Sequence, residues 1–243
     1  MAPVWLHLRA ALLEIARTPA FLVPTAVFPS MLFLFFGLPS ARTPQAAAFI
    51  LTSFAVFGVM GVCFYQFGVG IAEDRAGPWE DYLRTLPVTA AQRFAARLLA
   101  ALAVTAVTLL LLGVTAVATT PARLSVARWL LLVAALLVGG VPFGLFGIAL
   151  GYSVPARAAV PIANLIYLPL SFLGGIWLPP DQLPGVVAWI SPLLPSRIAG
   201  ELAWAAALGR SLAPAWLAGL AAYTLVGYLA CLWAYRRSEQ AYG

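Results

Sequence analysis

Residues able to do chemistry are scarce in this chain, and their scarcity excludes several classes of enzyme. All fourteen Lys-or-Arg residues are arginines, so a phosphate-binding loop ending in Gly-Lys-Ser or Gly-Lys-Thr cannot exist, and we do not expect the chain itself to hydrolyse ATP. The single histidine, His7, excludes a metal site built from several imidazoles. Cys63 and Cys231 both lie in apolar runs, where we expect them to act as small packing residues rather than as a disulfide.

The remaining catalytic arrangements also lack their residues. An intramembrane hydrolase needs a nucleophile beside a base, yet no histidine or lysine lies in any long apolar run. An intramembrane aspartyl protease needs two embedded aspartates, whereas Asp74, Asp81 and Asp181 all lie between such runs. We therefore expect no catalytic residue, no metal site and no cofactor bound by this chain.

The longest charge-rich stretch, residues 73–97, predicts a docking element. Pro78 suits the first turn of a helix, where the N–H that proline lacks is not needed, and Pro87 ends that helix. The helix over 78–86 has an acidic side and an apolar ridge. The alternative is an ordinary interfacial loop held by anionic headgroups, but those would repel its carboxylates, so a protein partner fits better. The candidate contact residues are Trp79, Glu80, Asp81, Leu83, Arg84 and Leu86.

Composition places the elements around this loop in a membrane. The chain has 243 residues, of which 63% are hydrophobic and 9% charged, too little charge for the surface of a soluble protein. We expect an all-α integral membrane protein with a single domain over residues 1–243. Six apolar runs approach the ~20 residues that a helical span requires. The expected spans are 20–38, 47–72, 95–118, 129–151, 159–178 and 212–235.

The N-terminal segment and the arginines predict the orientation. Residues 3–17 alternate apolar and polar positions at helical spacing, which predicts an amphipathic helix lying on the membrane surface. A signal peptide cleaved before Arg42 is the alternative. With the N-terminus inside, nine arginines fall in inner segments and five in outer ones. The net charge of +6 then sets orientation and does not indicate nucleic acid, and we expect both termini and the loop at 73–94 to be cytoplasmic.

A few polar and aromatic side chains interrupt the spans. Gln66 and Asn164 cost free energy in hydrocarbon unless they hydrogen bond, so both should face other helices. For Asn164 an interhelical hydrogen bond is favoured over a ligand contact. Phe28 and Phe33 lie in the first span, which carries two prolines and should be kinked. Three roles are open for these two side chains: contact with lipid, packing against other helices, or lining a path for an apolar substrate.

The fourth span carries a stripe of glycines at spacings of 4, 3 and 4 residues. Such spacing places the glycines on one helix face and lets another backbone approach closely. We therefore predict a helix-packing surface. Its residues are Gly140, Gly144, Gly147 and Gly151.

The segment before the last span, residues 174–209, predicts two short helices. They cover about 182–190 and 196–208, with Ser196 as a cap of the second and Gly209 as its stop. Both are too short to cross a bilayer, so they read as re-entrant or interfacial elements on the outer face. The charged residues there, which we expect to form a solvated rim, are Asp181, Arg197 and Glu201.

Taken together, three features resemble the membrane subunit of an ABC exporter of the second class, close to the daunorubicin-resistance and sodium-export permeases. The first is the flat helix at 3–17. The second is LRTLPVTAAQ after an acidic, glycine-containing start of the inner loop, and the third is GGIWLPPDQLP followed by ISPLLPSRIAGEL before the last span. The resemblance extends over essentially the whole chain and rests on the order and spacing of these motifs.

The resemblance implies a permease subunit of an ATP-driven exporter in a prokaryotic cytoplasmic membrane. Residues 78–86 would be the coupling helix seated on a separate ABC ATPase that binds ATP and Mg²⁺, and the helix at 3–17 would also touch it. Two ATPases would serve two permeases, the second being another copy or a sister chain. The dimer interface and substrate path would involve spans one, two and five, with the outer helices at 182–208 closing the exit. The implied path residues are Phe28, Phe33, Tyr65, Gln66, Asn164 and Tyr167.

Substrate class follows from the character of the spans. Uncharged spans rich in aromatic residues favour a hydrophobic or amphipathic substrate such as a drug, a lipid or a glycolipid, as in multidrug efflux. Two other functions are left open: a non-catalytic membrane anchor or assembly protein, and an ATP-independent transporter. The anchor would not depend on an ATPase, and ion-coupled transporters usually need buried charge, which these spans lack.

Overall fold

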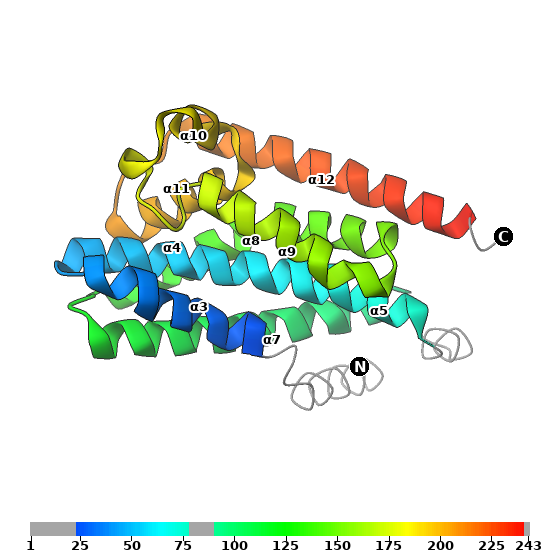
Figure 1. The fold of residues 1–243 in the computed structure, drawn as a ribbon, viewed down its shortest axis with the longest axis horizontal. Coiled ribbons are helices and arrows are strands. Elements are labelled where there is room, and N and C mark those ends of the chain that lie inside the picture. Colours follow the sequence, from blue (N-terminus) through cyan, green and yellow to red (C-terminus); the bar gives the residue numbers. More distant parts are fainter. Residues whose placement is uncertain (1–22, 78–89, 241–243) are drawn as a thin grey trace.

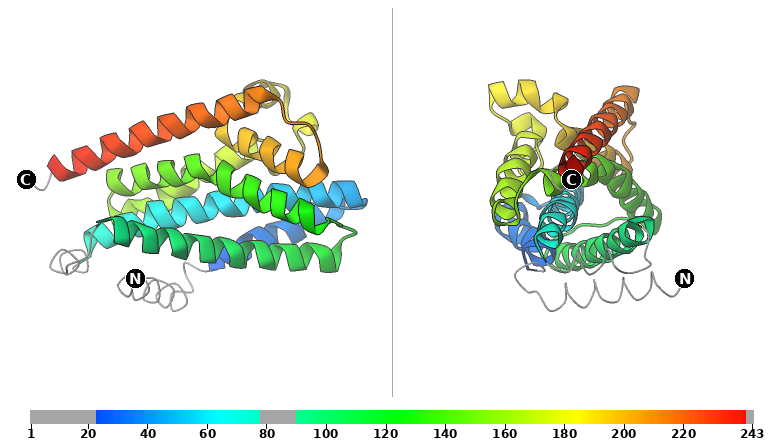
Figure 2. Two further views of the ribbon diagram at one scale, coloured as in Figure 1. Left: turned by 180° about the vertical axis from the view of Figure 1, so that it is seen from behind. Right: turned by 90° about the vertical axis from the view of Figure 1, so that its right-hand side faces the viewer.

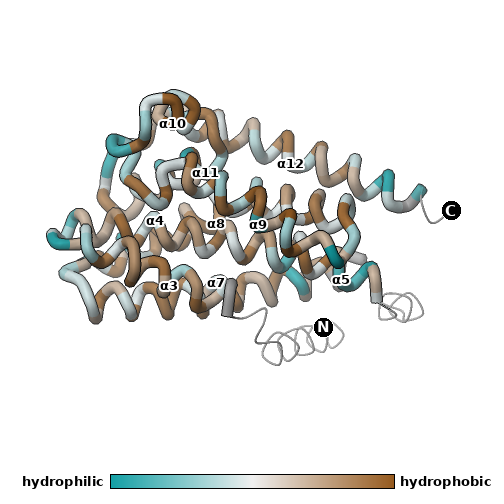
Figure 3. The backbone as a smooth tube through the Cα atoms, viewed as in Figure 1, coloured by the Kyte–Doolittle hydropathy of each residue, from teal (hydrophilic) through white to brown (hydrophobic). Residues whose placement is uncertain are grey.

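A computed structural model of the chain describes residues 23–77 and 90–240, and all regular elements in these ranges are helical. The long helices run along one axis as a bundle (Figure 1). Five helices are long and apolar enough to cross a membrane, and a shorter apolar helix covers Thr25–Ser40. Hydrophobic residues fill the length of the bundle and hydrophilic ones gather at its two ends (Figure 3). The prediction of an all-α membrane protein is confirmed. The predicted helices at 3–17 and 78–86 lie outside the described residues.

The described part of the first span changes its winding along its length. A π-helical turn η1 (Val23–Val27) leads into α3 (Phe28–Leu32), followed by a second π-helical turn η2 (Phe33–Gly37) and a 3₁₀ turn η3 (Leu38–Ser40). Wide and tight turns of this kind replace regular i→i+4 hydrogen bonds where prolines remove backbone donors. The segment is therefore irregular where the sequence predicted a kink.

The second span forms the centre of the bundle. It comprises α4 (Pro44–Cys63), the π-helical segment η4 (Phe64–Val69) and α5 (Gly70–Ala76), which together make one helical run of 33 residues. The Thr43 side chain caps its start by accepting a hydrogen bond from the Ala46 N–H. In its apolar window 94% of the residues are buried. This helix is longer than the predicted 47–72 and is enclosed by the other helices.

Three further long helices complete the bundle. These are α7 (Ala90–Thr119), α8 (Val126–Ser153) and α12 (Pro214–Gln240). Two of them, α7 and α8, pack against the second span. Viewed along the bundle, α7 and α8 lie on one side, whereas α12 lies on the outside of the group (Figure 2). Only 6% of the residues in the apolar window of α12 are buried, because one face of the helix packs along α8 and the remainder faces away from the bundle.

The fifth span is α9 (Ala156–Leu173), which ends before the predicted 159–178 does. The cause lies in Gly174 and Gly175, the latter at φ 76°, a conformation that leaves the helix and that glycine adopts without steric cost. Hydropathy continues past this point, so the apolar pattern alone predicted a longer span.

The outer segment contains the two short helices. The first is α10 (Gly185–Ile190), between 3₁₀ turns η5 (Pro180–Gln182) and η6 (Ser191–Leu193), and the second is α11 (Pro195–Leu208). Gly209, at φ 70°, ends α11 as predicted. The predicted cap was wrong: α11 begins at Pro195, and the Ser196 hydroxyl instead donates to the carbonyl of Leu170 in α9, 2.6 Å away.

The glycine stripe of α8 faces the second span. A Cβ at Gly147 would stand 2.6 Å from the Cys63 carbonyl oxygen, and one at Gly151 would stand 2.7 Å from the Phe67 carbonyl oxygen. At Gly144 the nearest atoms belong to the Phe67 ring at 3.8 Å, an ordinary contact. The two backbones therefore touch at the inner half of the stripe, beside the π-helical segment η4.

Candidate functional site

The two helices that flank the inner loop are joined by charged side chains. Arg97 in α7 forms an ion pair with Asp74 in α5, so the two helices on either side of the loop are joined at its foot. Asp74 stands near the C-terminal end of α5, where the helix dipole disfavours a carboxylate, and the guanidinium compensates for that position. The predicted coupling residues at 79–86 lie outside the described part of the chain, but the helices that carry them are fastened together.

Arg97 also reaches the irregular part of the second span. Its Nη1 donates to the backbone carbonyl of Gln66, 2.9 Å away, within η4. In a π-helical turn the regular i→i+4 ladder is interrupted, and carbonyls there take other donors. One side chain of α7 thus holds both the π-helical segment and the end of α5.

A neighbouring arginine joins the loop base to α8. Arg75 Nη1 donates to the carbonyl of Gly151, 2.9 Å away, in the last turn of α8, whose final carbonyls have no partner within the helix. The Arg75 guanidinium also lies 5.2 Å from the centroid of the Tyr152 ring, a cation–π distance. Tyr152 in turn packs edge-to-face on Tyr235 of α12, with ring centroids 5.2 Å apart. We call Asp74, Arg97, Arg75, Gly151, Tyr152 and Tyr235 the inner clamp.

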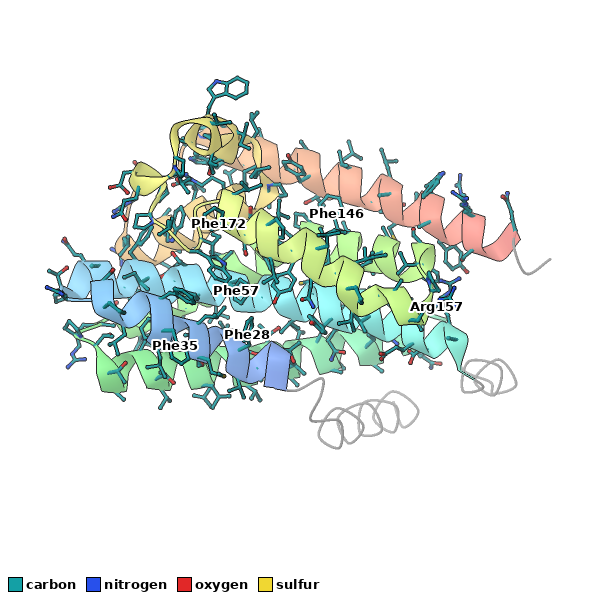
Figure 4. All side chains as sticks on the ribbon, viewed as in Figure 1. Phe28, Phe35, Phe57, Phe146, Arg157 and Phe172 are labelled. Carbon is teal, nitrogen blue, oxygen red and sulfur yellow. The ribbon has the colours of Figure 1, made fainter. Side chains whose placement is uncertain are left out.

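Deeper in the bundle, aromatic rings gather where α4, η4 and α9 meet. The Tyr65 hydroxyl donates to Asn164 Oδ1 at 3.2 Å, so Asn164 makes an interhelical hydrogen bond. The Tyr167 ring lies within 5.3 Å of Phe57 and 6.4 Å of Tyr65. Phe28 of α3 joins the group through Phe57, and the two rings lie side by side in Figure 4.

Four of the six predicted path residues are buried within the chain, whereas Phe28 and Asn164 are half-buried. Phe33 is fully buried, and Tyr65, Gln66 and Tyr167 are at most 7% exposed. In this conformation they face neighbouring helices and not an open path. In the described part of the first span, Phe35 and Phe36 are exposed instead, and the Phe36 ring also packs on Trp177.

Gln66 carries an unsatisfied group. Its side chain is 7% exposed, and no donor or acceptor among the described residues reaches its Nε2. Buried polar groups are almost always hydrogen bonded, because an unpaired amide costs free energy in an apolar interior. The sequence correctly placed Gln66 among helices, but the interhelical hydrogen bond expected of its side chain amide is absent from the described residues.

The outer charges are packed, which corrects part of the predicted solvated rim. Arg197 Nε donates to Glu201 Oε1 at 2.8 Å, and the guanidinium lies 5.6 Å from the centroid of the Trp204 ring. The Arg197 and Glu201 side chains are only 14% and 24% exposed. Asp181 is exposed, as expected of a rim residue. The prediction failed for the pair because it treated α11 as lying outside the bundle.

α11 is a fixed part of the outer half. Trp204 stacks on Phe49 of α4, and its Nε1 donates to the Ser53 hydroxyl at 2.9 Å. At the far end of α11, Arg128 of α8 donates to the Ala206 carbonyl at 3.3 Å. α11 therefore fills the space between α4 and α8 and stabilises the outer half of both.

Comparison with known proteins decides the family. The ABC-2 type transporter family matches residues 3–207 of the chain. The chain belongs to this family. It is also 25% identical over 241 residues to the "Putative transport permease YvfS" of Bacillus subtilis (strain 168), covering 95% of this chain and 96% of that protein. The chain is thus an ABC-2 permease, a multi-pass membrane transport protein, and the predicted resemblance to this family is confirmed.

Some residues of this ABC-2 permease were not foreseen as parts of a site. Arg75 and Arg97 were assigned only an orienting role, and their position beside the acidic start of the loop was the available signal. Trp177 and Trp204 had no signal beyond their type, yet each donates a hydrogen bond to a serine in the core. Across residues 23–77 and 90–240, no three His, Cys, Asp or Glu side chains lie together as a metal site would require.

Proposed function

We propose that this ABC-2 permease is the membrane subunit of an ATP-driven exporter for a hydrophobic or amphipathic molecule. A separate ABC ATPase would dock on the helix at 78–86 and bind the ATP and Mg²⁺ that the chain itself does not hold. The observation that carries the proposal is the closed base of the inner loop, where Asp74 and Arg97 join α5 to α7. Because the two helices are fastened there, movement of a docked loop would shift both as one body.

The substrate class rests on the character of the bundle. Arg197 and Glu201 pair with each other, and the buried residues around the centre are aromatic rings, amides and aliphatic side chains. A drug, lipid or glycolipid would suit such surroundings better than a small ion. Since Tyr65 and Tyr167 are buried between α4 and α9, the path would open only when α9 moves away from α4.

A second permease would pack against the face formed by the first span and α9. These two segments lie on the same side of the bundle (Figure 2), and both keep large apolar side chains exposed, including Phe35 at 71% and Leu165 at 74%. A second copy or a sister permease would cover them. Lipid would contact α12. Arg157 and the last turn of α12 lie at the same end of the bundle (Figure 4). This end would face the cytoplasm, and by the distribution of arginines both termini would lie on that side.

The test is transport in inverted membrane vesicles that contain the chain and its ATPase, with a panel of amphipathic fluorescent drugs and lipids. ATP-dependent uptake of a panel member is expected, and Trp79→Ala or Glu80→Arg should abolish it while membrane level and thermal stability stay unchanged. Uptake that persists without the ATPase would support an ATP-independent transporter. Unchanged uptake in both variants would overturn the assignment of the coupling helix.

A further inference from the structure

The inner clamp extends beyond the two helices that flank the loop. In the proposed function, movement of the docked loop passes to α5 and α7, the two helices that flank it. The structure adds two contacts that lead elsewhere: Arg75 to the Gly151 carbonyl of α8, and Tyr152 of α8 to Tyr235 of α12. These contacts join the C-terminal ends of α5, α8 and α12, which lie at one end of the bundle (Figure 1).

We infer that Arg75 is a positioning residue that carries movement of the loop to spans four and six, so that α8 and α12 move with α5. This inference rests on the proposed function, because it needs a docked ATPase to move the loop. It deepens that function by naming which spans respond.

The chemistry of Arg75 suits this task. The Gly151 carbonyl belongs to the last turn of α8 and lacks a helical donor, so the guanidinium supplies a hydrogen bond that the helix cannot make itself. A planar, permanently charged guanidinium can donate to a carbonyl and lie over an aromatic face at once. Directly beside this contact, Gly151 meets the Phe67 and Gly68 carbonyls with no room for a Cβ, so α8 cannot slide freely along the second span here.

The contact of α8 with α12 at the inner end can be changed separately from the Arg75 contact. α12 packs along α8 over much of its length, and at the inner end this packing includes the edge-to-face pair of Tyr152 and Tyr235. Removing the Tyr152 ring would break this ring pair but leave the Arg75 hydrogen bond to the Gly151 backbone. The geometry therefore predicts two successive steps, from α5 to α8 and from α8 to α12.

The experiment is amide hydrogen exchange on the chain in complex with its ATPase in lipid nanodiscs, compared without nucleotide and with ATP, Mg²⁺ and vanadate. In the wild type, nucleotide should change exchange at the inner ends of α5, α7, α8 and α12. Arg75→Ala should keep the change in α5 and α7 and lose it in α8 and α12. Arg75→Lys, which can still donate to Gly151, should restore the response of α8. Tyr152→Leu should reduce the response at the inner end of α12 and leave the response of α8 unchanged.

Arg236→Ala is the matched control, since Arg236 is an exposed arginine at the same end of the bundle. It should leave every response unchanged. A purely structural role for Arg75 would raise exchange equally with and without nucleotide, and this result would overturn the inference, as would a full α8 response in Arg75→Ala. Should Arg75→Ala fail to fold, Tyr152→Leu still decides the second step and Arg75→Lys the first. Absence of any nucleotide response in wild-type α5 and α7 would overturn the proposed function instead.

Discussion

The second span and α12 both pack along α8, but among the described membrane spans one is the most enclosed and the other the least. The run from α4 through α5 is 94% buried over its apolar window, whereas α12 is 6% buried. The second span meets α8 through backbone contacts at Gly147 and Gly151, and α12 meets α8 through Gly227, whose Cβ would stand 3.0 Å from Leu145 Cβ. An enclosed helix can move only if its neighbours move with it. A peripheral helix can yield into lipid.

This difference explains why the loop belongs to the second span. The loop follows α5 directly, so any force on it enters the most connected helix in the structure. α12 is the last span and contributes Tyr235 to the inner clamp, where its ring packs on Tyr152. We therefore expect substitutions of the same kind to be costly on α4 and mild on α12.

The largest contrast should come from one substitution made on both helices. Leu51→Ala on α4, where the side chain is 1% exposed, removes packed methyl groups and should destabilise the chain by about 2 kcal/mol or more. Leu225→Ala on α12, where the side chain is 58% exposed, should change stability by less than about 0.5 kcal/mol. Unfolding of the purified protein in detergent measures both. Equal effects would remove the distinction between the two helices.

A pair of glycine substitutions tests the backbone contact itself. Gly147→Ala drives a Cβ against the Cys63 carbonyl oxygen and should cost roughly 1–3 kcal/mol. Gly144→Ala, in the same stripe, meets only the Phe67 ring at 3.8 Å and should be tolerated. Thermal unfolding in nanodiscs distinguishes the two. If Gly144→Ala destabilised the chain as much as Gly147→Ala, the conclusion that α8 approaches the second span more closely at Gly147 than at Gly144 would be wrong.

The hydrogen bond between α4 and α11 should contribute less to stability than the close backbone contact of α8 with the second span. Trp204→Phe keeps the stacking on Phe49 but loses the hydrogen bond to Ser53, which should cost about 1 kcal/mol. Ser53→Ala supplies the second arm of a double-mutant cycle, because it removes the same bond from the other side. Strict additivity of the two changes in unfolding free energy would show that the bond contributes nothing.

The smallest effect concerns the side-chain amide of Gln66 in η4. Gln66→Leu removes a buried group without a described partner, so stability should stay constant or rise slightly. Asn164→Leu is its counterpart, since Asn164 accepts from the Tyr65 hydroxyl, and should cost about 1 kcal/mol. A clear loss of stability in Gln66→Leu, seen in the same unfolding assay, would mean that the amide is satisfied in solution.

The sequence predicted the features that depend on local residue patterns. It missed the contacts that form only when segments distant in the sequence pack together. Hydropathy located the membrane helices, and the spacing of the α8 glycines indicated a close approach. The same spacing does not reveal that Gly144 is loose, because the partner's side chains decide that. Asp74 and Arg97 are 23 residues apart in the sequence, and they pair only because the fold brings α5 and α7 together. Arg197 was expected in solvent because α11 is short, but its length allows it to fit inside the outer half of the bundle.

The proposed function depends most directly on whether the chain works with an ATPase. The decisive measurement is mass spectrometry of proteins that co-purify with the chain from its native membranes in mild detergent. We predict an ABC ATPase in a near one-to-one ratio, lost in a Trp79→Ala, Glu80→Arg double variant and retained in Arg236→Ala. Repeated recovery of the chain with no ATPase, under conditions that preserve other membrane complexes, would contradict the account and favour an anchor or an ATP-independent transporter.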